Sequence, residues 1–304
     1  MTHKTKTVIQ RRGSARNFLF SKTDIGRIKD VERKKAVGVS EVLQSVFPDM
    51  LAGRGAIDQA VQHLDSVDQF TALAIGVDQT RRAEEKYSNP GALDEHVEVA
   101  GILETICREK SGLWGTLETG LFCSIFPGTK QSEGLEIARD IQDRLAEKAE
   151  QPVTIGIASY PISAFKKSDM IDNSRKALDH AAFFGPGSAV AFDGVSLNIS
   201  GDKLYENGDL QGAIDEFKRA LLIDPSNVNV HNSLGVCFGL QGEYESAIEE
   251  FKQVASIDPG DYMAMFNLGL VYVLRKQPER ALEFFLNADK INGDVYEVAF
   301  QSGK

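Results

Sequence analysis

A 34-residue repeat in the last third of the chain constrains the fold more than any other feature of the sequence. Gly201, Gly235 and Gly269 are 34 residues apart, and the same spacing relates three alanines and three phenylalanines: Ala213, Ala247, Ala281, Phe217, Phe251 and Phe285. A fixed period of about 20–50 residues is typical of proteins that stack copies of one supersecondary unit. The period therefore predicts three stacked units over residues 194–296, at 194–227, 228–261 and 262–295.

Each repeat has the pattern of two helices joined by a short turn. Asn207-Gly208-Asp209 has the residue types of such a turn. Asp224-Pro225 ends the second helix, because proline disfavours helical geometry in the residue before it. We therefore expect an all-α superhelix, with the small glycines and alanines where paired helices cross closely and the phenylalanines between one hairpin and the next.

This pattern resembles the tetratricopeptide repeat (TPR) family over about residues 194–296. The resemblance implies a superhelix with a concave groove, lined by the first helix of each repeat, that binds a protein or peptide partner. The matching groove positions are Asn198, Asp202, Asn232, Met263, Phe266, Asn267, Leu270 and Val273. Some relatives clamp a C-terminal carboxylate with Lys and Arg, which these positions lack.

The third repeat carries an apolar stripe at helical spacing, formed by Met263, Phe266, Leu270 and Val273. One interpretation is a groove that takes a hydrophobic or helical segment of a partner. The equal alternative is a stripe already covered by the chain's own C-terminus or by the neighbouring domain.

Residues 48–193 alternate strands and helices. Thr71–Val77 has the composition of a buried strand, and two further strands surround the turn Glu118-Thr119-Gly120. The remaining expected elements are helices at 92–109, 131–147 and 168–183 and strands at 153–159 and 189–192. This order predicts an α+β sandwich with an antiparallel-rich sheet and helices packed on it.

The element order resembles the GGDEF domain of diguanylate cyclases over about 150 residues. Five segments carry the resemblance: Asp49–Gly53, Val77-Asp78, Leu121–Pro127, Val153–Ala158 and Lys176–Ala182 running into Gly185. The resemblance implies a nucleotide-cyclase-like fold. The family's own chemistry joins two GTP molecules into cyclic di-GMP by metal-assisted phosphoryl transfer.

The metal-binding carboxylates of the family are missing from this sequence. In the family they are the first Asp of a strand-end Asp-x-Asp and the acid in the middle of the hairpin motif; here these positions are Gly76 and Gly120. The motif itself contains Glu118, Thr119, Gly120, Leu121 and Phe122. Asp78 remains, but in the family it is not the principal metal ligand. Glycine has no side chain that could bind the cation, and the cation is what neutralises the phosphate charge.

Other family positions have changed as well. Glu84 stands at the guanine-reading Asn, while Ala182 and Pro186 stand at the phosphate-contacting Lys and Arg. We therefore expect a degenerate GGDEF-like domain with no catalytic residue, no metal and no cofactor, which serves as a platform or dimer interface. The alternative is a nucleotide or cyclic di-GMP sensor, or a residual diguanylate cyclase.

The net charge of −10 hides a basic N-terminus. Residues 1–40 contain eleven Lys/Arg and three acids, so the remainder carries −18. An acidic body repels phosphates, which argues against a nucleic-acid partner. No apolar run approaches the roughly 18 residues that span a bilayer, and no secretory signal precedes the domains. These features, with three scattered cysteines, predict a cytoplasmic protein, and the two family resemblances imply a scaffold of bacterial signalling.

The chain ends carry three further expectations. Residues 1–22 predict a disordered basic tail, and residues 23–47 predict a helix that packs on the domain or mediates a homodimer. Residues 297–304 predict a short C-terminal tail.

Overall fold

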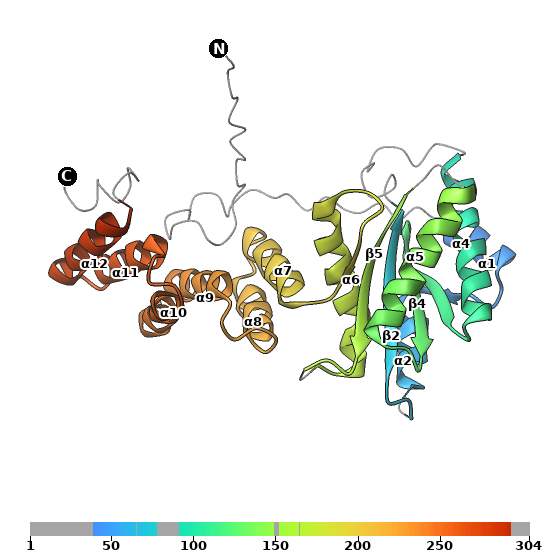
Figure 1. Cartoon of the computed structure of the whole chain (residues 1–304), viewed down its shortest axis with the longest axis horizontal. Coiled ribbons are helices and arrows are strands. Elements are labelled where there is room, and N and C mark those ends of the chain that lie inside the picture. The colour runs from blue at the N-terminus through green and yellow to red at the C-terminus, as the bar shows by residue number, and fades with distance from the viewer. Residues whose placement is uncertain (1–38, 65, 78–90, 149–151, 164, 293–304) are drawn as a thin grey trace, which may run out of the picture. The chain divides into compact units, whose positions relative to one another are not determined.

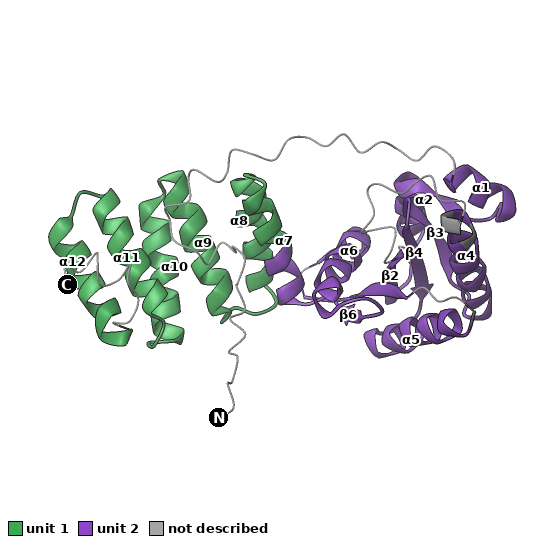
Figure 2. Ribbon diagram, turned by 90° about the horizontal axis from the view of Figure 1, so that it is seen from above, with its two compact units in different colours: residues 1–29, 200–304 green, residues 30–199 purple. Residues whose placement is uncertain are grey.

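The fold was obtained as a computed structural model, which describes residues 39–64, 66–77, 91–148, 152–163 and 165–292 (Figure 1). The chain divides into two compact units: residues 30–199, called the sheet unit, and residues 1–29 with 200–304, called the repeat unit (Figure 2). The division falls inside α7 (Gly194–Glu206), whose first residue coincides with the predicted start of the repeats. The predicted tails, most of the predicted N-terminal helix, Asp78 and Glu84 lie outside the described residues.

The sheet unit contains a six-stranded sheet in the order β1-β3-β4-β2-β5-β6. The central strand β2 pairs antiparallel with β4 and β5, and β3 pairs antiparallel with β4. The short edge strands β1 and β6 pair parallel with β3 and β5. The antiparallel-rich sheet with helices is therefore confirmed. The strand bounds are β1 Leu51–Ala52, β2 Phe70–Val77, β3 Leu113–Glu118, β4 Leu121–Pro127, β5 Val153–Tyr160 and β6 Ala189–Ala191.

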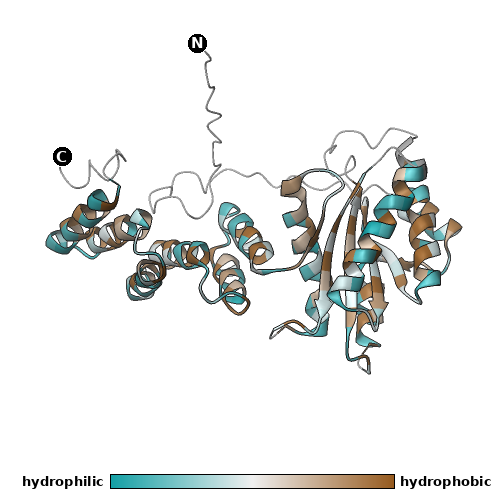
Figure 3. Ribbon diagram, in the orientation of Figure 1, coloured by the Kyte–Doolittle hydropathy of each residue, from teal (hydrophilic) through white to brown (hydrophobic). Residues whose placement is uncertain are grey.

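Helices cover both faces of the sheet. All eight residues of β2 are buried, which explains why apolar residues dominate its sequence. The strands at the centre of the sheet are largely hydrophobic (Figure 3). Leu73 and Ile75 belong to the main core with α4 and α5, whereas Ala74 packs with Leu178 of α6. Because neighbouring strand residues point to opposite faces, α4 and α5 lie on one face and α6 on the other. The helices are α1 Val39–Val46, α2 Gly53–Gln62, α4 Gly91–Glu109, α5 Gln131–Lys148 and α6 Met170–Ala181.

The repeat unit consists of helical hairpins, as the period predicted. Asp209, Asn227 and Asp261 precede α8, α9 and α11, and each side chain accepts a hydrogen bond from the backbone of the first helical turn. Gly242 ends α9 in the left-handed conformation. The helices are α8 Leu210–Leu221, α9 Val228–Gln241, α10 Tyr244–Ile257, α11 Tyr262–Leu274 and α12 Pro278–Ile291. None of the helices in the described ranges is both long and apolar enough to span a membrane.

The repeated glycines mark the closest approach within each hairpin. A Cβ atom on Gly201, Gly235 or Gly269 would lie 2.4, 2.6 and 2.4 Å from the ring of Phe217, Phe251 and Phe285, respectively. Each phenylalanine therefore packs on the glycine of its own hairpin, although the sequence analysis placed it between hairpins. This contact explains why glycine and phenylalanine share one period.

Candidate functional site

The two glycines at the predicted metal positions lie side by side in the sheet. Gly76 pairs with Leu121 across β2 and β4, and the Val77 amide donates to the Gly120 carbonyl at 3.0 Å. Gly120 occupies the tight turn between β3 and β4 with a φ of 74°. The fold thus brings together the two positions that the GGDEF resemblance identified. Neither residue offers a side-chain ligand to a cation there.

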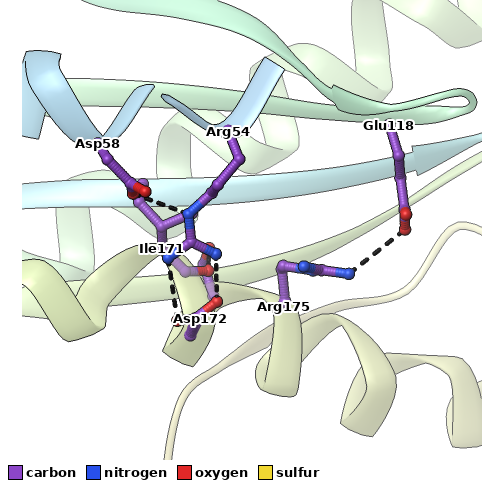
Figure 4. A network of polar contacts seen from close by, with 7 residues as sticks. Arg54, Asp58, Glu118, Ile171, Asp172 and Arg175 are labelled. Atoms are coloured by element: carbon purple, nitrogen blue, oxygen red, sulfur yellow. Dashed lines mark hydrogen bonds and ion pairs between the residues drawn. The ribbon is translucent and has the colours of Figure 1, made fainter. Parts of the chain in front are cut away.

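The rest of the hairpin motif is committed to packing. Leu121 and Phe122 are buried, and Leu121 packs with Ala74 and Leu178 beneath α6. Glu118, at the end of β3, forms an ion pair with Arg175 of α6 at 3.3 Å (Figure 4). The pair joins the hairpin to α6. Thr119 lies in the turn that follows Glu118.

The predicted phosphate-contacting positions are uncharged and exposed. Ala182 begins the short 3-10 helix Ala182–Phe184, and Pro186 follows it after one residue. Both Ala182 and Pro186 are exposed to solvent. Over the described ranges, no three His, Cys, Asp or Glu side chains form a group that could hold a metal ion.

A second polar cluster, which the sequence analysis missed, ties α2 to α6 (Figure 4). The Arg54 guanidinium donates to Asp58 at 2.7 Å and forms two bonds with Asp172 at 2.5 and 3.0 Å. The hydrogen bonds from Arg54 lower the pKa of Asp172, and the same contact raises the pKa of Arg54. No local pattern signals a contact between residues 118 positions apart.

A cleft of about 600 Å³ adjoins this cluster. Two of its cations are already engaged: Arg54 binds the two aspartates, and Lys167 donates to the Leu64 carbonyl at 2.9 Å. The contacts of these two cations therefore stabilise the fold around the cleft. Its lining residues are Arg54, Asp58, Val61, Gln62, Tyr160, Phe165, Lys166, Lys167 and Ser168.

On the first helix of each repeat, one side lies next to the side that contacts the second helix. A helix turns by about 100° per residue, and the glycines at 201, 235 and 269 mark the side that meets the second helix. Residues six, three and two positions before each glycine, and one, four and five after it, lie together beside that contact. We call this side the inner arc. All eight predicted groove residues fall on it.

The inner arc is largely buried. Asn198, Asn232, Phe266, Asn267 and Leu270 are 6% exposed or less, whereas Asp202 and Met263 are half-buried. The Phe266 ring packs on Phe285 with their centroids 5.4 Å apart. Of the two interpretations of the apolar stripe, an open groove and a covered surface, the burial of Phe266 and Leu270 agrees with the second at these two positions.

Exposed apolar surface remains at the end of α11. Val273 is 44% exposed, and its neighbour Leu274, which also lies on the inner arc, is 41% exposed. The sequence analysis named Val273 and missed Leu274. Leu274 could have been found from the sequence, because it is the next residue on the same side of the helix. These two residues are the most accessible apolar groups on the inner arc of the third repeat.

Comparison with known proteins supports the repeat assignment. The family model described as "TPR repeat" matches residues 201–242, and that described as "Tetratricopeptide repeat" matches residues 241–294. No curated protein matches the chain.

Solved structures resemble the two parts of the chain separately. The GGDEF domain of YfiN (TpbB) from Pseudomonas aeruginosa has 22% identity and a TM-score of 0.39, with 46% of this chain and 86% of that chain covered. The second TPR domain of human RPAP3, bound to an HSP70 peptide, has 15% identity and a TM-score of 0.35, with 36% and 92% covered. YrrB, a TPR protein with an unusual peptide-binding site, has 19% identity and a TM-score of 0.37, with 57% and 77% covered. Residues 201–294 of this chain contain tetratricopeptide repeats.

Proposed function

We propose that this chain is a non-catalytic protein-interaction or scaffold protein of bacterial signalling, which binds a protein partner through its TPR groove in the cytoplasm. The sheet unit serves as a folded platform or a homodimer interface. The observation that carries the proposal is the contrast between an intact repeat framework and a sheet end whose metal positions are Gly76 and Gly120.

The proposed lack of catalysis rests on the negative charge that phosphoryl transfer must neutralise. Two triphosphates bring several negative charges to one site, and metal-bound carboxylates are what hold the neutralising cations. Gly76 and Gly120 supply none, and Ala182 and Pro186 supply no cation to the phosphates. Glu118, the nearest acid in the motif, is already paired with Arg175. These losses support a domain without cyclase activity.

Partner binding draws support from the exposed apolar residues of the inner arc. Contiguous exposed apolar surface commonly marks an interaction site, and a pair of exposed apolar residues on the inner arc would line the groove. Val273 and Leu274 form such a pair on α11, with half-buried Met263 on the same side. The peptide bound to RPAP3 and the peptide-binding site of YrrB support a peptide-binding role for these repeats.

The test is quantitative affinity capture with the full chain. We expect the double variant Val273→Asp/Leu274→Asp to retain less than a tenth of the partner captured by the wild type. In the complex, the two aspartates would be buried where the wild type makes apolar contacts. The free-energy cost of burying these two charges exceeds the roughly 1.4 kcal/mol that corresponds to tenfold weaker binding. The amounts of each captured protein are compared by mass spectrometry.

The matched control places the same charges on the second helix of the same repeat. Leu282 and Leu286 of α12 are 45% and 36% exposed, close to the values of Val273 and Leu274. Leu282→Asp/Leu286→Asp should capture the partner within twofold of the wild type. Equal capture by both variants would contradict binding through the inner arc.

A further inference from the structure

The strand β6 forms one edge of the sheet, where its other neighbour would be a further strand (Figure 2). Just before the strand, the Ser188 carbonyl accepts a hydrogen bond from β5 at 2.9 Å, and just after it the Phe192 amide donates to β5 at 2.7 Å. The backbone groups of successive strand residues point alternately to the two neighbouring positions in a sheet. Ala189 and Ala191 therefore direct their N–H and C=O groups away from β5, toward the open edge.

These outward backbone groups are available to another strand. Within the part of the chain that the structure describes, no residue forms a hydrogen bond with the outward groups of Ala189 and Ala191. Both residues are half-buried, so they remain in contact with solvent. A row of unpaired N–H and C=O groups along an edge is a template for pairing with a further strand. The opposite edge offers less, because β1 has only two residues.

The segment around β6 lacks the features that commonly protect an exposed edge. Proteins protect edges with charged side chains, above all lysine, or with a proline in the strand. Residues 181–192 contain no charged residue, and their single proline, Pro186, precedes the strand. The turn before β6 also presents the ring of Phe183, which is 72% exposed. This edge is uncharged and apolar in a chain whose net charge is −10.

A second copy of the chain matches this edge in charge and in hydrogen bonding. Two copies that each carry −10 repel each other, so they approach at least cost through a surface without charge. If the two β6 strands lie antiparallel about a two-fold axis at Val190, Ala189 of each copy lies opposite Ala191 of the other. Residues opposed in this way exchange both of their N–H···O bonds. The symmetric contact therefore satisfies every outward group of both strands.

We propose that two copies of this chain associate through antiparallel pairing of their β6 strands, which joins the two sheets into one. The inference rests on the proposed function, since it names the surface through which the sheet unit acts as a homodimer interface. A three-residue strand and a short apolar turn bury little area compared with the roughly 1,200 Å² of a stable interface. The dimer therefore exchanges with monomer at micromolar concentrations, and each dimer offers two repeat units to a partner.

Sedimentation velocity of the full chain over a range of micromolar concentrations measures this association. We expect the wild type to pass from monomer to dimer, and Ala191→Pro to weaken the dimer at least tenfold. Proline removes the outward amide of residue 191 from both copies, and this amide takes no part in the ladder with β5. The control Ala191→Ser keeps the amide and should dimerise within twofold of the wild type. A monomeric wild type, or an unweakened Ala191→Pro dimer, would overturn the inference.

Cysteine substitutions test the register of the two strands independently of the proline variant. At the two-fold axis, Val190 lies opposite Val190 of the other copy in a non-hydrogen-bonded pair, whose Cα atoms are about 4.5 Å apart. This separation allows a disulfide, so mild oxidation should link Val190→Cys into a covalent dimer. In the control Ala191→Cys, the two cysteines are not opposed and should link at least tenfold more slowly. The three native cysteines are buried. Equal rates of linkage would contradict pairing about Val190.

These measurements separate the β6 interface from the proposed binding of a partner. Partner capture that depends on Val273 and Leu274 tests the groove, whereas sedimentation and cysteine linkage test β6. If capture shows this dependence but the wild type stays monomeric, the β6 interface is wrong and the proposed partner binding stands. If Val190→Cys links selectively but capture is insensitive to Val273 and Leu274, the β6 interface stands and the proposed groove is wrong.

Discussion

The variant Gly156→Ala is expected to lose about 3 kcal/mol or more of unfolding free energy in the sheet unit. A Cβ at Gly156 in β5 would lie 2.0 Å from the Leu178 nitrogen and 2.1 Å from the Ser174 oxygen of α6. Both are backbone atoms, so no side-chain rotation relieves the clash and the helix must move off the sheet. Overpacking of a rigid core commonly costs about 1–3 kcal/mol, and a backbone clash lies at the upper end.

The single tryptophan makes this loss measurable in the sheet unit alone. Trp114 is 6% exposed in β3, so its fluorescence during urea unfolding reports on this unit. The control is Gly55→Ala in α2, where an added Cβ meets nothing within 4 Å. Because alanine favours helix over glycine, this control should be neutral or up to about 1 kcal/mol more stable. Equal stability of both variants would show that α6 does not approach β5 as described.

The variant Phe251→Ala is expected to destabilise the repeat unit by about 3–5 kcal/mol, the range for removing a buried aromatic ring. Phe251 is fully buried and packs on Gly235 of the same hairpin. A cavity in the middle repeat also weakens the contacts with both neighbours, because stacked repeats depend on adjacent units. Far-ultraviolet circular dichroism during urea unfolding measures the loss.

The exposed Phe184 supplies the matched control for a ring removal. It is 69% exposed, so Phe184→Ala should change the unfolding free energy by about 0.5 kcal/mol at most. The variant Gly235→Ala tests the contact from its other side. Its added Cβ would press on the Phe251 ring, and Phe251→Leu should relieve part of that cost in the double variant. Additive losses would argue against the Gly235–Phe251 contact.

The repeat helices could be predicted from the sequence because their constraints are local and recur three times. Gly201 and Phe217 are close along the chain, and their spacing fixes both helices of the hairpin. The central strand could be predicted equally well: the sequence predicts a strand at Thr71–Val77, and β2 is Phe70–Val77. Each of these elements has enough residues to show its own periodicity.

Contacts between distant segments could not be predicted in this way. The strand β1 has two residues, too few to show alternation, and it exists through its pairing with β3. The Arg54–Asp172 contact also joins distant segments. For Phe266 and Leu270, helical spacing gives the side of the helix, but burial depends on what packs there.

We propose that this chain works through its surfaces because the end of its sheet does not bind a metal–nucleotide complex. Isothermal titration calorimetry of the full chain with GTP and Mg²⁺, and separately with cyclic di-GMP, tests it most directly. The glycines at positions 76 and 120 predict no saturable heat with either ligand up to about millimolar concentration, where binding is worth roughly 4 kcal/mol. Micromolar binding of either nucleotide would contradict the account.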